Sequence, residues 1–148
     1  MPSGGAGSRQ EPVRRSFEPN LAELIDRLTV DQIKEVLLPE GREDYADEIK
    51  RLESDIDAII EEKGLELSAR LVRIVIVLAQ MNLHIWHSKD RMQEDADHYS
   101  EWLKLAHQLN GTRNRMKNLL VDESGDAPPS AQHTNVGTDG LQGWDVSV

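Results

Sequence analysis

The residues with the clearest chemical potential lie in the most apolar stretch of the chain, LVRIVIVLAQMNLHIW, which runs from Leu71 to Trp86. Within and just after it, Asn82, Trp86 and Asp90 follow one another at steps of four, so on a helix they share one face. An asparagine on an apolar face costs about 1–3 kcal/mol unless it finds hydrogen-bond partners. We therefore expect a polar site along this face.

A second polar group lies near the end of the candidate helical region, in the segment NGTRNRMKN that begins at Asn110. Asn110, Arg113, Asn114 and Lys117 fall on one broad helical face and offer donors that suit a phosphate or a carboxylate. Arg113 also occupies a position where the apolar seam of this helix calls for an apolar residue. These residues predict either a ligand site or a set of internal hydrogen bonds that holds the helix in register.

The two polar groups meet if the last two long helices form a hairpin that turns near Asp95. Asn82 precedes that point by thirteen residues and Asn110 follows it by fifteen, which leaves them roughly 3 Å apart along the helix axis. We predict that Asn82 and Asn110 share a hydrogen bond, that Arg113 supplies a positive charge to a buried acceptor, and that Trp86 forms an aromatic wall. Asp90 lies nearer the turn and is too far along the axis to pair with Arg113.

The pattern HxxHxxD, formed by His84, His87 and Asp90, is the nearest approach to a metal site. A step of six residues turns Asp90 away from His84, and the histidines share their side of the helix with Arg73 and Arg91, which disfavours a divalent cation. We predict no metal and no cofactor. His87 and Asp90 remain candidates for acid and base roles, and the chain has no cysteine to act as a thiol nucleophile.

Helical nucleotide pyrophosphohydrolases, which are small and acidic like this chain, hold magnesium with EExxE and a later ExxD. Here Glu61, Glu62 and Glu66 give EExxxE, one residue out of step, and the central apolar segment carries no carboxylate from Leu67 to Lys89. These departures make this enzyme class a poor match.

Hydrophobic periodicity predicts an all-α protein, a small helical bundle without strands. Two short helices are expected after Asn20, because Asn20 with Glu23 and Thr29 with Gln32 both form capping-box patterns. Three long helices follow, over about 42–63, 68–93 and 98–121, and Gly64 has the position of a helix C-cap. We divide the chain into a disordered arm (1–19), a helical domain (20–121) and a disordered acidic tail (122–148).

The 148 residues carry a formal net charge of −10, concentrated in the first helices and in the C-terminal tail. Such a chain repels nucleic-acid phosphates, so nucleic acid is not an expected partner. The apolar stretch from Leu71 to Trp86 is short for a membrane span and is interrupted by polar residues, and no targeting segment is evident. We therefore expect a soluble, cytoplasmic protein.

Two segments resemble a known family. NLHIWHSKD, which begins at Asn82, is similar to the N-x-x-hydrophobic-W-H-x-x-D segment of the domain-of-unknown-function 4254 family, and LNGTRN, which begins at Leu109, is similar to its L-N-x-x-R-N segment. The family's acidic residue before the final aspartate is replaced here by Lys89. The resemblance covers about a third of the chain. It implies an all-helical protein often encoded among bacterial surface-polysaccharide genes, without an established activity.

The resemblance also implies that one set of residues acts together: Asn82, Trp86, His87, Asp90, Asn110, Arg113 and Asn114. We expect a non-catalytic helical module that binds a partner protein or a small anionic ligand and completes its core as a homodimer. One alternative is a metal-dependent enzyme that acts on a nucleotide or a sugar phosphate. The other is a structural interaction module that uses its acidic N-terminal helices.

Overall fold

The computed structural model describes residues 18–125 and 147–148 of the chain. Within these residues the protein is all-α, as predicted, and contains no strand. It comprises four helices and one 3₁₀ turn: α2 (Leu21–Leu37), α3 (Arg42–Lys63), α4 (Ala69–Glu94), η1 (Ala96–His98) and α5 (Tyr99–Ser124). Residues 1–17 of the predicted arm (1–19) and residues 126–146 of the predicted tail (122–148) lie outside the described residues.

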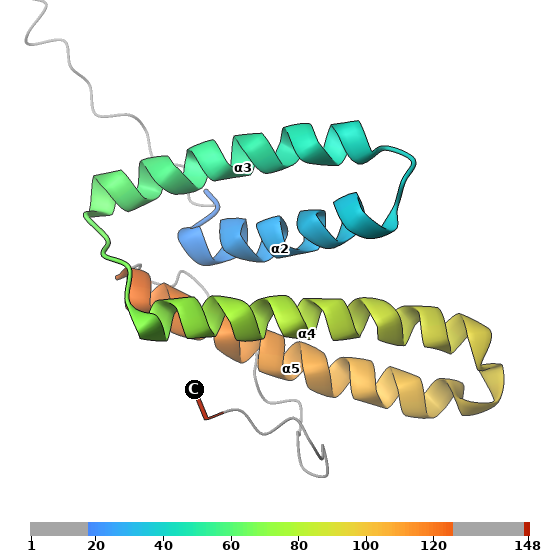
Figure 1. Ribbon diagram of the computed structural model, residues 1–148. Coiled ribbons are helices and arrows are strands. Elements are labelled where there is room, and N and C mark those ends of the chain that lie inside the picture. Colours follow the sequence, from blue (N-terminus) through green and yellow to red (C-terminus); the bar gives the residue numbers. More distant parts are fainter. Residues whose placement is uncertain (1–17, 126–146) are drawn as a thin grey trace, which may run out of the picture.

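The helices form two antiparallel hairpins, α2–α3 and α4–α5, stacked one on the other (Figure 1). The shorter helix α2 lies in the middle, because it packs against α3 on one side and against both α4 and α5 on the other. The longest helices, α4 and α5, run side by side along their length. Any group that α2 presents to the lower hairpin therefore meets two helices at once.

The prediction of two short N-terminal helices was wrong, because residues 21–37 form the single helix α2. Thr29 was expected to cap a second helix. Its hydroxyl instead donates to the backbone carbonyl oxygen of Asp26, at 2.7 Å, within the continuous helix. A threonine that bonds back to the preceding turn is compatible with a helix interior, so the capping-box pattern is not used as a break.

The predicted caps at Asn20, Ser68 and Gly64 are confirmed. Asn20 Oδ1 accepts a hydrogen bond from the Glu23 amide at 2.9 Å, and Ser68 Oγ accepts one from the Leu71 amide at 3.0 Å. Gly64 ends α3 at a φ of 62°, in the left-handed region where a glycine is favoured. The last helix extends one turn beyond the predicted end at Val121, to Ser124, before Gly125 terminates it.

The main hydrophobic core lies where α2 covers the α4–α5 hairpin. Its fully buried large side chains include Ile74 and Leu78 of α4 and Leu109, Met116 and Leu120 of α5. A smaller cluster between α2 and α3 is formed by Leu21, Leu24, Leu52 and Ile56. The main cluster joins the two hairpins, and the smaller one holds α2 to α3.

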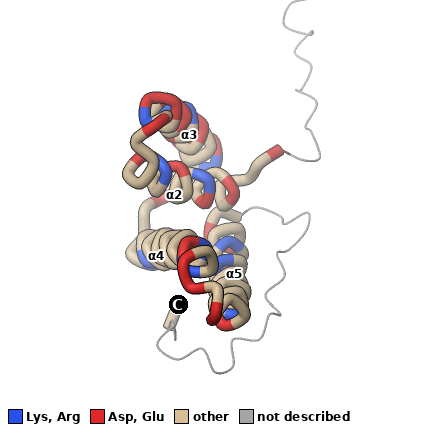
Figure 2. The backbone as a smooth tube through the Cα atoms, turned by 90° about the vertical axis from the view of Figure 1, so that its right-hand side faces the viewer, with Lys and Arg blue, Asp and Glu red and all other residues tan. Residues whose placement is uncertain are grey.

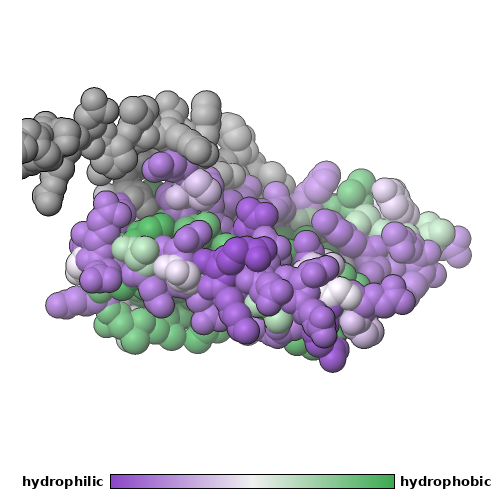
Figure 3. Space-filling view, turned by 90° about the horizontal axis from the view of Figure 1, so that it is seen from above, coloured by the Kyte–Doolittle hydropathy of each residue, from purple (hydrophilic) through white to green (hydrophobic). Residues whose placement is uncertain are grey.

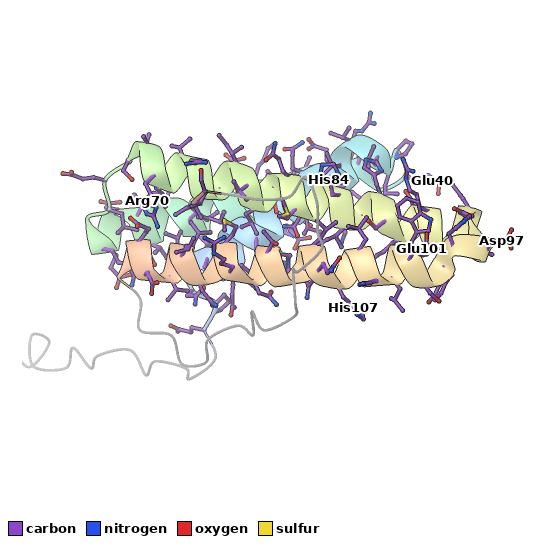
Figure 4. The ribbon with its side chains drawn as sticks, turned by 90° about the horizontal axis from the view of Figure 1, so that it is seen from below. Glu40, Arg70, His84, Asp97, Glu101 and His107 are labelled. Carbon is purple, nitrogen blue, oxygen red and sulfur yellow. The ribbon has the colours of Figure 1, made fainter. Side chains whose placement is uncertain are left out.

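The end of the described chain also contacts the lower hairpin. Val148 packs against the main core, and its carbonyl oxygen accepts a hydrogen bond from Arg115 of α5. Arg73 of α4 donates to the Ser147 hydroxyl at 2.6 Å. Arg70, near the start of α4 (Figure 4), forms an ion pair with Glu123 of α5 at 2.8 Å.

Charge and apolar surface are divided between the two hairpins. Acidic residues are frequent on α3, whereas much of α4 is uncharged (Figure 2). Within the described residues, α4 is the one helix whose length and composition would allow it to cross a membrane, with a mean hydropathy of 1.3, although 28% of that apolar window is buried in the protein. A core helix of a water-soluble protein meets the same criteria, so this finding leaves the predicted localisation untested.

Candidate functional site

The centre of the polar site is Asp26 of α2, which was not among the site residues predicted from the sequence. Asp26 is only 7% exposed, and its carboxylate faces the α4–α5 hairpin. It accepts hydrogen bonds from Asn82 Nδ2 at 2.8 Å, from Arg113 Nε at 3.1 Å and from a terminal guanidinium nitrogen of Arg113. Lys117 Nζ lies 3.6 Å from the same carboxylate.

Asn82 lies where the sequence predicted a polar site, but its partner differs from the prediction. Among the described residues there is no hydrogen bond between Asn82 and Asn110. The amide nitrogen of Asn82 donates instead to Asp26 and to Thr29 Oγ1, the latter at 2.6 Å. Both acceptors belong to α2, so the asparagine joins α4 to the upper hairpin rather than to α5.

Arg113 links the remaining helix to this cluster. One of its nitrogens donates to Asn110 Oδ1 at 3.1 Å, three residues earlier on α5, while others donate to Asp26. The predicted buried acceptor for Arg113 is thus the Asp26 carboxylate. Asn114 is half-buried on the same helix and is engaged in contacts of its own. We call the set of Asp26, Thr29, Asn82, Asn110, Arg113 and Lys117 the ion cluster.

The chemistry of the ion cluster is directed inward. The carboxylate of Asp26 accepts hydrogen bonds from α4 and α5, and the cationic groups of Arg113 and Lys117 lie next to it. Its hydrogen-bonding capacity and its charge are therefore satisfied within the protein. Buried ion pairs of this kind fix how elements fit together, because a shifted arrangement would leave a charge unpaired. The arrangement therefore locks α2 onto the α4–α5 hairpin.

The other residues of the expected site lie elsewhere. Trp86 is half-buried and Asp90 is exposed, and among the described residues no hydrogen bond or ion pair joins either of them to the ion cluster. His87 lies on yet another side of α4. The seven residues that the sequence grouped together are thus divided among three places on the hairpin.

His87 lines a hollow of about 330 Å³ between α4 and α5, near the turn that joins them. The α4 side of this hollow comprises His84, His87, Ser88 and Arg91, and the α5 side comprises Trp102, Leu105 and Leu109. Figure 4 shows His84 on this hairpin, while His107 points outward from the opposite side of α5. The hollow combines an apolar wall with nitrogen-bearing side chains.

Burial and nearby side chains influence the charge of the residues that line the hollow. Burial lowers the pKa of His84, and the nearby His87 lowers it further, so neutral imidazole is favoured there. Arg91 lies over the Trp102 ring at 5.0 Å, a cation–π contact. No group of three or more histidine, aspartate or glutamate side chains able to hold a metal ion occurs in the described part of the chain.

At the turn itself, Asp95 organises the entry into α5. Its carboxylate accepts a hydrogen bond from Trp102 Nε1 at 3.1 Å and contacts His98 Nδ1 at 2.9 Å. The His98 contact, followed by the Trp102 bond, lowers the pKa of Asp95, and the same His98 contact raises the pKa of His98. This network fixes the orientation of the Trp102 ring at the edge of the hollow.

A further buried carboxylate lies between α2 and α3. Asp31 is 3% exposed, and its Oδ2 has no hydrogen-bond partner. Burial raises the pKa of Asp31, and the nearby Glu48 carboxylate raises it further. Because Glu48 is itself paired with Arg27 at 3.0 Å, this group sits within a local charge network of the upper hairpin.

Comparison of the chain with protein families, with curated proteins and with solved structures finds no match.

Proposed function

We propose that this protein is a non-catalytic helical interaction module that pairs with a second copy of itself through α4. The observation that carries the proposal is a stripe of α4 residues that the fold leaves largely uncovered. It comprises Val72, Ile76, Ala79, Leu83 and Trp86, and we call it the α4 stripe.

Spacing and exposure distinguish the α4 stripe from scattered apolar surface. Its members follow one another at steps of four, three, four and three, the heptad pattern of helices that pack along their length. Val72 is 40% exposed, Ile76 is 52% exposed and Leu83 is 38% exposed, although all three are large apolar residues. Apolar side chains gather along one margin of the molecule in Figure 3. A stripe with this period favours another helix as its occupant.

A second copy is the occupant that we favour. The stripe carries no charge between Val72 and Trp86, so two such stripes can meet without burying like charges. Ala79 at its middle allows close approach of two helices, with larger side chains on either side. Two-fold pairing of identical surfaces is also the commonest form of assembly among soluble proteins.

The non-catalytic part of the proposal is supported by the ion cluster. Its carboxylate and guanidinium satisfy each other between helices rather than lining the hollow. His87 and Asp90, the acid and base candidates, are separated in the fold: His87 lines the hollow, and Asp90 is exposed and is not among the lining residues.

The test is the molar mass of the whole chain at micromolar concentration, measured by light scattering after size exclusion. We expect twice the 16.7 kDa of one chain. Substitution of Ile76→Glu together with Leu83→Glu should yield the monomer with an unchanged helical circular-dichroism spectrum. The matched control is Val36→Glu, since Val36 is 61% exposed on α2 and lies outside the α4 stripe.

A wild type that is monomeric at every accessible concentration would overturn the proposal. If that monomer also sediments with neutral phosphatidylcholine vesicles, the α4 stripe would be assigned to a lipid surface instead.

A further inference from the structure

The hollow between α4 and α5 lies on a different side of α4 from the α4 stripe, so it is independent of the proposed pairing. At about 330 Å³, it has the volume of a small-molecule site at the lower end of the usual range of 300–1,000 Å³. Its residues come from two long helices joined by a structured turn, which gives it a preformed shape.

The two walls of the hollow differ in chemistry. The α5 wall presents only an aromatic ring and two leucine side chains, from Trp102, Leu105 and Leu109. The α4 wall comes from the polar residues His84, His87, Ser88 and Arg91, although the surface that they expose to the hollow is mostly apolar. A molecule that fills this space therefore meets a mostly apolar surface, with the Arg91 guanidinium beside the Trp102 ring.

The charge of the hollow is positive. Arg91 contributes a permanent cation, and no carboxylate is among the lining residues. Within the described part of the chain Arg91 forms no ion pair, and its guanidinium is held against the Trp102 ring at 5.0 Å. The Asp95 carboxylate at the turn is engaged by His98 and by Trp102 Nε1. Arg91 is thus a cation that is held in place by Trp102 and has no carboxylate partner among the described residues.

We infer that the hollow binds a small amphipathic carboxylate. Its apolar body lies against Trp102, Leu105 and Leu109, and its carboxylate forms a bidentate pair with Arg91, a geometry that the planar guanidinium favours. His84 and His87 lie beside this pair in the α4 wall. The hydroxyl of Ser88 donates to the His84 carbonyl oxygen at 2.8 Å and so maintains the wall rather than the contact with the ligand.

The experiment titrates the whole chain with indole-3-acetate and with its neutral amide, indole-3-acetamide, by isothermal calorimetry and amide NMR. We expect the acetate to bind more tightly and to shift the Trp102 indole signal. The substitution Arg91→Gln should weaken acetate binding by about tenfold, the loss of one charge-assisted hydrogen-bonded pair, and leave the amide unaffected. The substitution Trp102→Ala should weaken both ligands.

The matched control is Lys89→Gln, which removes an exposed cation two residues from Arg91 that does not line the hollow. It should leave both affinities unchanged. The inference is overturned if neither ligand binds the wild type at millimolar concentration, if Lys89→Gln weakens acetate binding as much as Arg91→Gln does, or if the shifted signals lie outside the hollow. None of these measurements depends on whether the chain is a dimer.

Discussion

Replacing Asp26 with alanine removes the carboxylate that Arg113 and Lys117 share. Both cations would remain at the junction of the two hairpins, close to each other and without their counter-charge. The Asn82 amide would also lose one of its two acceptors and keep only Thr29. The substitution therefore tests whether the ion cluster holds the hairpins together.

Burial decides the size of the effect. The side chains of Asp26, Lys117 and Arg113 are 10%, 11% and 23% exposed, so this is not a surface ion pair of 0–1 kcal/mol. Breaking a buried pair by removal of one partner costs about 3–5 kcal/mol, because the remaining charge is desolvated without compensation. That is a large share of the roughly 5–15 kcal/mol that a typical domain has in total.

Urea unfolding followed by far-UV circular dichroism measures this loss as a lower midpoint at unchanged slope. Asp57→Ala is the matched control, since Asp57 is an exposed aspartate on α3. The triple substitution Asp26→Leu, Arg113→Met and Lys117→Met should recover most of the lost stability, because it removes the buried charges together. A loss below about 1 kcal/mol for Asp26→Ala would refute the reasoning, since surface pairs have that value.

Two further predictions concern titratable groups. Asp31→Asn should raise the stability by about 1 kcal/mol near neutral pH, because the amide removes a buried charge with an unsatisfied oxygen and can donate to Glu48. Because the folded state raises the pKa of Asp31, this gain should vanish at low pH, where the aspartate is protonated, and a gain that persists there would contradict the cause given. Asp95→Asn should return the pKa of His98 toward about 6.5, as followed by NMR. The Asp95–His98 contact should strengthen the turn mainly between about pH 4 and pH 6.5, since it is lost when pH falls through the lowered pKa of Asp95 or rises through the raised pKa of His98.

The sequence predicted the long helices well because their signals are local. Ser68 marks a helix start through its side-chain oxygen, and Gly64 marks a helix end through its left-handed backbone. The apolar period of α4 is likewise visible without knowledge of its neighbours. At Thr29 the capping pattern is misleading, because it lies inside the single helix α2. The Thr29 hydroxyl donates to the backbone carbonyl oxygen of Asp26 within the helix and accepts a hydrogen bond from Asn82 of α4.

The candidate site was predicted only in part, since its central residue lies on another hairpin. Asn82 and Arg113 each appear as a polar residue on an apolar face, which is why both were singled out. Asp26 gives a similar signal, as it lies on the face of α2 between Ala22 and Thr29 that is turned toward the core. The prediction of two short helices in place of α2 hid this signal, because an aspartate on a short helix is usually exposed to solvent.

The distance along the chain between Asp26 and Arg113 has a consequence for folding kinetics. These residues are 87 positions apart, whereas each hairpin closes through contacts between neighbouring helices. Local contacts form early and distant ones late, so the two hairpins should assemble before the ion cluster does. A cluster that forms after the rate-limiting step acts chiefly on the rate of unfolding, and its charges would then determine how long the folded state lasts rather than how quickly it is reached.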